Sequence, residues 1–176
     1  DHGEMLGDHG IGGKAAYHYD SCIRVPMIWR GDDRWEGGRS RDEIIELVDF
    51  APTLLEAAGT DKGASMGGIP YGALLREDGP YEGRDHAYVE SFAGGPLDPT
   101  PSPVCWPRTI RTDRYRCTFY PDPGEGELYD LSKDPHETRN LYARPGYKDV
   151  VEAHRKRLVS RLILLDHPLP DRSSSV

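Results

Sequence analysis

The sequence predicts an α/β segment joined to a smaller α+β subdomain, and three observations support this fold class. A short apolar run at residues 25–30 has the length of a buried strand, and a helix-like segment follows at 50–58. Further along, four short runs of strand-forming residues are separated by turn signals, and apolar residues from 147 to 165 recur at helical spacing. We therefore assign residues 1–79 to the α/β part and residues 80–176 to the α+β subdomain.

The first part of the chain predicts a loop, one strand and one helix. Residues 1–20 form a loop punctuated by glycine, and the apolar run Val25-Pro26-Met27-Ile28-Trp29-Arg30 follows it as a buried strand. Asp49 is placed to cap a helix over residues 50–58, since its side chain can accept a hydrogen bond from the first turn. Gly59 then ends this helix as its C′ residue.

The second part predicts a small antiparallel sheet covered by a helix. Its expected strands are residues 86–91, 108–111, 115–120 and 127–131. Thr112-Asp113-Arg114 separates the second strand from the third and is typical of a hairpin turn. The helix begins near Pro145, and its apolar stripe predicts that it packs on one face of the sheet.

The net charge argues against some kinds of partner, and the cysteine spacing argues against a disulfide or zinc framework. The net charge of −8 argues against nucleic acid or an anionic membrane as the main partner, and no apolar run approaches the length of a membrane span. Three widely spaced cysteines form neither a disulfide framework nor a zinc ribbon, so buried free thiols are the plain interpretation. Cytoplasmic and periplasmic locations both stay open, as does assembly into a homo-oligomer.

The richest candidate site lies at residues 1–10. Asp1 and His2 set a hard oxygen beside an imidazole nitrogen, and Gly3 would let the backbone approach a bound ion closely. By ligand type the pair favours Mn²⁺, Mg²⁺ or Zn²⁺ over Ca²⁺, and at least two further ligands must come from elsewhere. The alternatives are a polar loop without a metal and a zinc cage completed by Asp8 and His9.

Two further positions carry candidate chemistry. Lys14 follows two glycines, and a lysine on such a loop near a metal can serve as a point charge for a phosphate or sulfate oxygen; an exposed surface lysine is the alternative. Cys105-Trp106-Pro107-Arg108 is similar to a nucleophile motif. No histidine base lies near Cys105 in the sequence, so a structural or incidental cysteine is the favoured interpretation.

An ordered series of motifs runs through nearly the whole chain. Its members are Asp1-His2-Gly3-Glu4, Gly7-Asp8-His9-Gly10, Gly13-Lys14, Arg24-Val25-Pro26, Val48-Asp49-Phe50-Ala51-Pro52-Thr53-Leu54-Leu55, Ala58-Gly59, Arg111-Thr112-Asp113-Arg114-Tyr115-Arg116, Glu127-Leu128-Tyr129-Asp130-Leu131, Asp134-Pro135, Glu137 and Asn140-Leu141. Each is weak alone, but their order and spacing closely resemble the C-terminal part of arylsulfatase-like type I sulfatases, in the alkaline phosphatase superfamily.

This resemblance implies both a fold and a set of site residues. Residues 1–79 would be the C-terminal part of an alkaline-phosphatase-like α/β domain, and residues 80–176 an α+β subdomain with a four-stranded antiparallel sheet and a C-terminal helix. Asp1 and His2 match two metal ligands. Lys14 matches the lysine that grips the sulfate oxygens, and His9 lies in the matching loop, so both are candidate catalytic residues. The family metal is usually Ca²⁺, with Mn²⁺ or a similar ion, such as Mg²⁺, as the alternative.

The resemblance also implies hydrolysis of a small-molecule or carbohydrate sulfate ester by a metal-activated formylglycine nucleophile. Family chains make this nucleophile from a Cys/Ser-x-Pro-x-Arg motif that precedes the Asp-His loop. The tetrapeptide at Cys105 is out of order and one residue short, so the role is not assigned to it. Residues 1–176 alone are therefore expected to be inactive. A phosphonate or phosphate ester hydrolase of the same superfamily and a non-catalytic structural module remain as alternatives.

Overall fold

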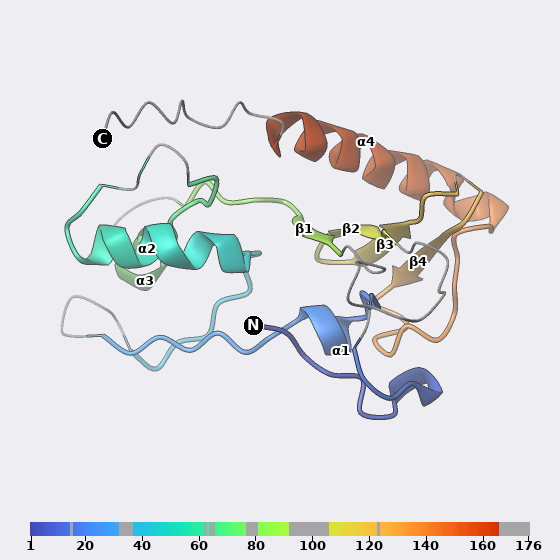
Figure 1. The fold of residues 1–176 in the computed structure, drawn as a ribbon, viewed down its shortest axis with the longest axis horizontal. Helices are drawn as coiled ribbons and strands as arrows, with labels where there is room; N and C mark the ends of the chain where they lie inside the picture. Colours follow the sequence, from blue (N-terminus) through green and yellow to red (C-terminus); the bar gives the residue numbers. More distant parts are fainter. Residues whose placement is uncertain are drawn as a thin grey trace, which may run out of the picture. The chain divides into compact units, whose positions relative to one another are not determined.

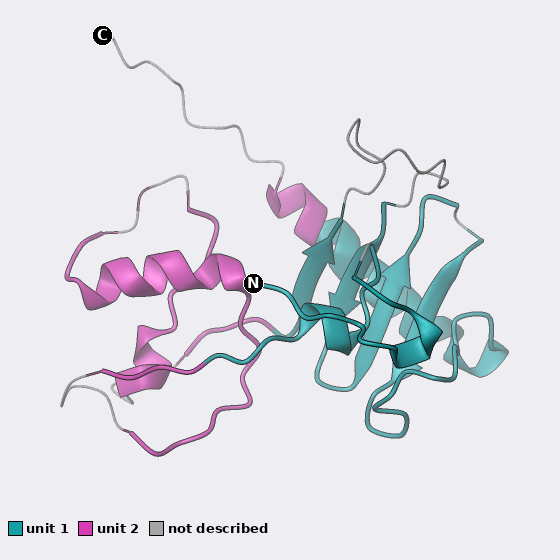
Figure 2. Cartoon of the chain, turned by 60° about the horizontal axis from the view of Figure 1, so that its bottom comes forward, with its two compact units in different colours: residues 1–27, 85–160 teal, residues 28–84, 161–176 magenta. Residues whose placement is uncertain are grey.

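A computed structural model describes residues 1–14, 16–31, 37–61, 63, 66–76, 81–91, 106–122 and 124–165. The chain divides into two compact units (Figure 2). Unit 1 contains residues 1–27 and 85–160, and unit 2 contains residues 28–84 and 161–176. The loop that begins with Asp1 therefore belongs to the same compact unit as the sheet. The expected division of the chain into an α/β part, residues 1–79, and an α+β subdomain, residues 80–176, stays a prediction.

Unit 1 is built on a four-stranded antiparallel sheet with strand order β1-β2-β3-β4 (Figure 1). The strands are β1 (Ala87–Glu90), β2 (Arg108–Arg111), β3 (Tyr115–Phe119) and β4 (Gly126–Asp130). The predicted turn between β2 and β3 forms, because the Thr112 amide donates to the Tyr115 carbonyl at 2.8 Å and the Tyr115 amide donates to Thr112 Oγ1 at 3.0 Å. The predicted sheet is therefore confirmed.

The two faces of this sheet have different chemistry. The register places Ile110, Cys117 and Leu128 side by side on one face, and all three are fully buried. Thr109 and Thr118 pair on the other face, where their hydroxyl groups share a hydrogen bond of 2.7 Å and are also buried. Because side chains alternate along a strand, the sheet has an apolar face and a buried polar face.

Helix α4 (Lys148–Leu165) covers the apolar face, after a short 3₁₀ turn, η3 (Pro145–Tyr147). Val151 and Leu158 join the core formed by the apolar face of the sheet, so the helix position is confirmed. The later members of the stripe, Val159, Leu162 and Leu165, are exposed, and the expectation of one continuous buried stripe is wrong for them. No helix in the described ranges is long and apolar enough to cross a membrane.

Residues 25–30 do not form the expected strand. The segment has no strand assignment, and Ile28 is 88% exposed. A short apolar run becomes a strand only when a neighbouring strand pairs with its backbone groups, and none of the described strands does so. The cysteines follow expectation where they are described, since Cys22 and Cys117 are buried free thiols. Cys105 lies outside the described residues.

Besides the end of α4, the described part of unit 2 contains a 3₁₀ turn, η2 (Leu47–Asp49), and the helices α2 (Phe50–Ala57) and α3 (Gly72–Arg76). Gly59 ends α2 as predicted: its φ is 73°, its amide donates to the Glu56 carbonyl, and the Thr60 amide donates to the Leu55 carbonyl.

The role expected for Asp49 is wrong. Its buried carboxylate makes no capping bond to α2 and instead accepts from the Glu46 amide at 2.8 Å and the Ile69 amide at 2.7 Å, and it pairs with Arg84. Asp49 therefore joins three separate segments of unit 2 instead of starting the helix.

Helix α4 provides a direct test of the core. Leu158→Asp should lower the free energy of unfolding by about 3 kcal/mol or more, because it places a charge among the buried side chains of the apolar face. Ile163→Asp on the same helix is the matched control, since Ile163 is 68% exposed and its substitution should change stability little. Urea unfolding of both variants measures the difference, and equal stabilities would contradict the placement of α4.

Candidate functional site

The loop that carries Asp1 and His2 is paired with helix α1 (Asp20–Ile23) through the backbone. The Gly3 amide donates to the Cys22 carbonyl at 2.8 Å, and the Glu4 amide donates to the Ser21 carbonyl at 3.1 Å. A Cβ on Gly3 would lie 1.9 Å from the Ser21 carbonyl oxygen. Gly3 is therefore required for the approach of two backbone segments, and the expected approach to an ion is not needed to explain it.

The side chains of Asp1, His2 and Lys14 lie together. His2 Nδ1 donates to the Gly3 carbonyl at 2.8 Å, because a carbonyl oxygen can only accept, so the lone pair of the ring is on Nε2. Lys14 Nζ is 2.5 Å from Nε2 and donates to it, and an Asp1 carboxylate oxygen is 3.8 Å from the same nitrogen. The three residues are exposed, which leaves this cluster accessible to a ligand.

The segment between these residues is a closed loop that returns Lys14 to His2. The Met5 amide donates to the Gly13 carbonyl at 3.2 Å, and Met5 is fully buried. Gly13 has a φ of 82°, a left-handed conformation that glycine adopts without steric cost. The backbone pairing between Met5 and Gly13 at the base of the loop thus places the Lys14 ammonium next to His2.

His9 lies elsewhere on this loop, in the 3₁₀ turn η1 (Asp8–Gly10). Its backbone is left-handed, with a φ of 54°, and its ring stacks on Tyr19 with 4.0 Å between the ring centroids. In the part of the chain that the structure describes, no group of three or more His, Cys, Asp or Glu side chains is arranged so that it could hold a metal ion. The zinc cage considered from Asp1, His2, Asp8 and His9 therefore does not form.

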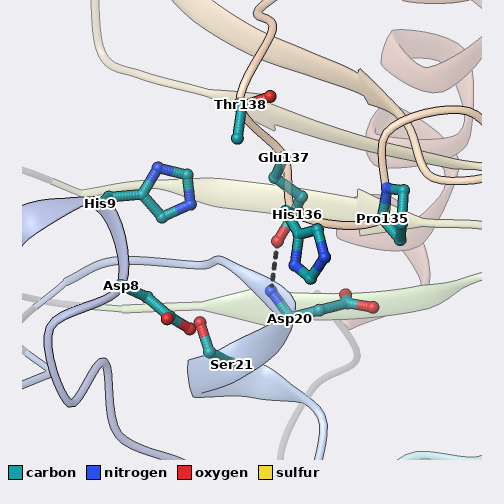
Figure 3. A pocket seen from close by; sticks show the side chains of 8 residues that line it. All are labelled: Asp8, His9, Asp20, Ser21, Pro135, His136, Glu137 and Thr138. Atoms are coloured by element: carbon teal, nitrogen blue, oxygen red, sulfur yellow. Dashed lines mark hydrogen bonds between the residues drawn. The ribbon is translucent and has the colours of Figure 1, made fainter.

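His9 lines an open polar pocket of about 450 Å³ in unit 1 (Figure 3). The lining residues come from η1, from α1 and from the loop after β4, and they are Asp8, His9, Asp20, Ser21, Pro135, His136, Glu137 and Thr138. Figure 3 shows the Glu137 side chain directed toward the start of α1, where it accepts a hydrogen bond from the Asp20 amide at 2.7 Å. Ser21 belongs both to this pocket and to the pairing that holds the Asp1 loop.

Arg116 pairs with the pocket residue Glu137, lies on the polar face of the sheet and is completely buried. Its guanidinium packs against the rings of Tyr19 and Tyr129, 4.7 and 4.8 Å from their centroids. It donates to a Glu127 carboxylate oxygen at 3.1 Å and pairs with Glu137 through Nε. Burial alone would lower the pKa of Arg116, but the two carboxylates outweigh it and raise that pKa. The arginine is therefore charged inside the protein.

Sequence reasoning assigned no role to Arg116 or Glu137. Both occur in the ordered motif series, and that membership is the signal that could have singled them out. Their partnership joins strand β3 to a loop 21 residues away, so no local pattern indicates it.

His18 attaches the segment before α1 to the polar face. One ring nitrogen is 2.8 Å from Thr109 Oγ1 and the other is 2.7 Å from Ser91 Oγ. Burial, together with the charges of Arg116 and Arg108, lowers the pKa of His18 to about 4. A neutral, buried imidazole thus helps to hold the chain that leads into α1.

Three known proteins are similar to this chain in sequence or in structure. A Bacteroides thetaiotaomicron Delta 4,5-hexuronate-2-O-sulfatase is 31% identical over 160 residues, which are 90% of this chain and 32% of the relative. A solved structure of a protein in complex with its substrate D-glucosamine-2-N,6-O-disulfate has a TM-score of 0.81 at 27% identity, covering 97% of this chain and 34% of the other. The phosphonate monoester hydrolase of Agrobacterium radiobacter has a TM-score of 0.80 at 27% identity, covering 93% and 34%.

The fold is therefore the C-terminal part of the alkaline-phosphatase-like fold found in sulfatases and related hydrolases. The chain spans about a third of the length of these relatives. It matches the family described as N-sulphoglucosamine sulphohydrolase, C-terminal, over residues 7–163, and it belongs to that family.

His18 makes the stability of unit 1 depend on pH. Its pKa in the folded protein, about 4, lies below its ordinary value of 6.5, so the folded state favours the neutral ring. The stabilisation is fully present above pH 6.5 and is lost as the pH falls toward 4, by up to about 3 kcal/mol. Urea unfolding between pH 7 and pH 4 should therefore show a smaller loss of stability in His18→Gln than in the wild type.

The difference between the two proteins isolates His18. Burial also lowers the pKa of His154, but this residue is present in both proteins and its contribution cancels. Parallel pH dependences would show that His18 does not have this role.

Proposed function

We propose that the intact protein hydrolyses sulfate esters, with Asp1 and His2 as ligands of a divalent cation and Lys14 as a contact to the sulfate oxygens. The observation that supports this most is the juxtaposition of Lys14 Nζ and His2 Nε2 at 2.5 Å, with the Asp1 carboxylate beside them. Membership of the sulphohydrolase family and the similarity to the Bacteroides thetaiotaomicron sulfatase support it independently.

The donor set fits a divalent cation. A carboxylate oxygen and the Nε2 lone pair of His2 are both normal ligands, although further ligands must come from other residues. Lys14 donates to this lone pair in the structure, so its ammonium would leave Nε2 when a cation binds there. The family resemblance favours Ca²⁺, with Mn²⁺ or Mg²⁺ as alternatives. Such a cation, when bound, polarises the oxygens of the ester and reduces the cost of charge on them.

Lys14 and His9 have different roles in this proposal. Lys14 holds a compact positive charge next to the metal-ligand pair, where it offsets negative charge on the equatorial oxygens as the ester bond breaks. His9 lies in the polar pocket, stacked on Tyr19, and we assign it to contact with the substrate. A carbohydrate sulfate ester is the expected substrate class, because a polar pocket suits hydroxyl groups and a structural relative binds a disulfated glucosamine as its substrate.

Phosphonate monoester hydrolysis is the second candidate. The Agrobacterium radiobacter enzyme matches this chain as well as the complex with the disulfated glucosamine does, with TM-scores of 0.80 and 0.81. An ammonium group is a point charge that binds either anion, so Lys14 does not separate the two substrates. Turnover of an aryl sulfate and of a phenyl phosphonate monoester by the intact protein distinguishes these candidates, and turnover of neither would favour a non-catalytic module.

Lys14 is the residue that tests the proposed chemistry. In the intact enzyme, Lys14→Ala should lower kcat/KM for an aryl sulfate by about 30- to 1000-fold, which corresponds to about 2–4 kcal/mol, with little change in melting temperature. Lys14→Arg should recover only part of the activity, because a planar guanidinium does not replace a compact ammonium. Lys156→Ala on helix α4 is the control, since Lys156 is an exposed lysine. A wild-type rate in Lys14→Ala would remove Lys14 from the site.

A further inference from the structure

Glu137 is a buried carboxylate that joins two distant parts of unit 1. Its side chain is only 3% exposed, and one of its oxygens accepts from the Asp20 amide at 2.7 Å, 117 residues away in the sequence. Asp20 is the first residue of α1, where a helix leaves its amides without partners inside the helix. Glu137 therefore satisfies an amide at the start of α1 from a different part of the chain.

The position of Glu137 is determined from its own loop as well. Its φ of 54° is uncommon for a residue with a Cβ and costs about 1 kcal/mol or more. Asp134 holds this conformation, because its carbonyl accepts from the Glu137 amide at 3.1 Å and its carboxylate accepts from the Arg139 amide at 2.8 Å. The loop is thus fixed in a strained form that directs Glu137 inward.

Arg116 ties this carboxylate to the sheet. The second oxygen of Glu137 pairs with Arg116 Nε, and the guanidinium itself packs against two tyrosine rings, Tyr129 on strand β4 and Tyr19 on the segment before α1. The start of α1 is therefore connected to the sheet by a charged pair that solvent does not reach.

Helix α1 is hydrogen-bonded to the loop that carries the proposed metal ligands, so fixing the helix also fixes this loop. The carbonyls of Ser21 and Cys22, directly after Asp20, accept the amides of Glu4 and Gly3. Gly3 is adjacent to His2, and its own carbonyl orients the His2 ring by accepting from Nδ1. Hydrogen bonds and short stretches of backbone thus connect Arg116, through Glu137 and helix α1, to the His2 imidazole.

We propose that Glu137 is a positioning residue for the Asp1–His2 pair: with Arg116 it fixes the start of α1, and α1 fixes the loop that presents the two ligands. This inference rests on the proposed function, because it assumes that the pair binds a divalent cation. Residues that orient metal ligands without touching the metal typically change metal affinity by about 10- to 100-fold when they are replaced.

Two isosteric variants separate positioning from a general contribution to folding. Glu137→Gln places an NH₂ group against either Arg116 or the Asp20 amide, both of which are donors, so one of the two contacts is lost. Glu127→Gln is the matched control, because Glu127 pairs with the same arginine at 3.1 Å, whereas the Asp20 amide bonds to Glu137. Both variants are expected to lower the melting temperature.

The experiment is calorimetric titration of the metal-stripped intact protein with Ca²⁺, repeated with Mn²⁺. Glu137→Gln should raise the Kd of the cation at least about tenfold, whereas Glu127→Gln should change it less than about twofold. His2→Ala is included to test the ligand assignment itself. If the wild type binds neither cation, or if His2→Ala binds normally, the proposed function fails. If His2→Ala loses binding while Glu137→Gln retains wild-type affinity, the positioning role alone is overturned.

A second pair of variants decides the question if Glu137→Gln does not fold. Asp20→Pro removes the amide hydrogen that Glu137 accepts, and proline is tolerated at the first position of a helix. Tyr19 already has the extended backbone that precedes proline. Asp20→Ala keeps the amide but, like Asp20→Pro, loses the ion pair with Arg111 at 3.0 Å. Weaker cation binding in Asp20→Pro than in Asp20→Ala supports the proposal, and equal binding overturns it.

Discussion

The buried ion pair between Arg116 and Glu137 is the interaction on which the arrangement of unit 1 depends. Neither group is accessible to solvent, and burial raises the pKa of Glu137 while the charge of Arg116 opposes this. Replacing such a pair by well-packed apolar side chains is often neutral or stabilising, whereas removing one partner leaves an uncompensated buried charge and costs about 3–5 kcal/mol. The pair is therefore poorly explained as a simple source of stability and well explained as a device that holds separate segments in one geometry.

The division of the sheet into an apolar face and a polar face explains how a charged pair can be buried in unit 1. The apolar face forms an ordinary core with α4, and this core supplies the hydrophobic burial. The polar face is then free to hold Arg116, the paired threonines and the His18 contacts, all of them buried and hydrogen-bonded. Alternation along β3 places Arg116 next to Cys117 in sequence but on the opposite face. One strand thus serves both the core and the support of the candidate site.

The sequence predicted the features that depend on neighbouring residues. The β2–β3 hairpin, the start of α4 near Pro145 and the role of Gly59 each follow from local turn chemistry or helical spacing, and each is confirmed. The family resemblance selected Asp1, His2 and Lys14, which the structure brings together, while their roles stay predictions.

Features that depend on residues far apart in the sequence were either not predicted or predicted wrongly. The Glu137 contact to Asp20 crosses 117 residues, Asp49 reaches Ile69 and Arg84, and the run at 25–30 lacks a paired strand among the described residues. In each case the decisive group lies outside any window that local patterning can examine. Exposure of the later apolar positions of α4 has the same origin, because helical spacing marks a face and does not supply what covers it.

Amide hydrogen exchange tests the central claim most directly, since it reports on the pairing of the ligand loop without requiring metal or substrate. In the wild-type protein the amides of Gly3, Glu4 and Asp20 should exchange slowly. In Glu137→Gln these three amides should exchange much faster than in the wild type. The amides of strand β3 should be as well protected in Glu137→Gln as they are in Glu127→Gln. Unchanged protection of Gly3 and Glu4 in Glu137→Gln would contradict the account, because the loop would then be held without the buried pair.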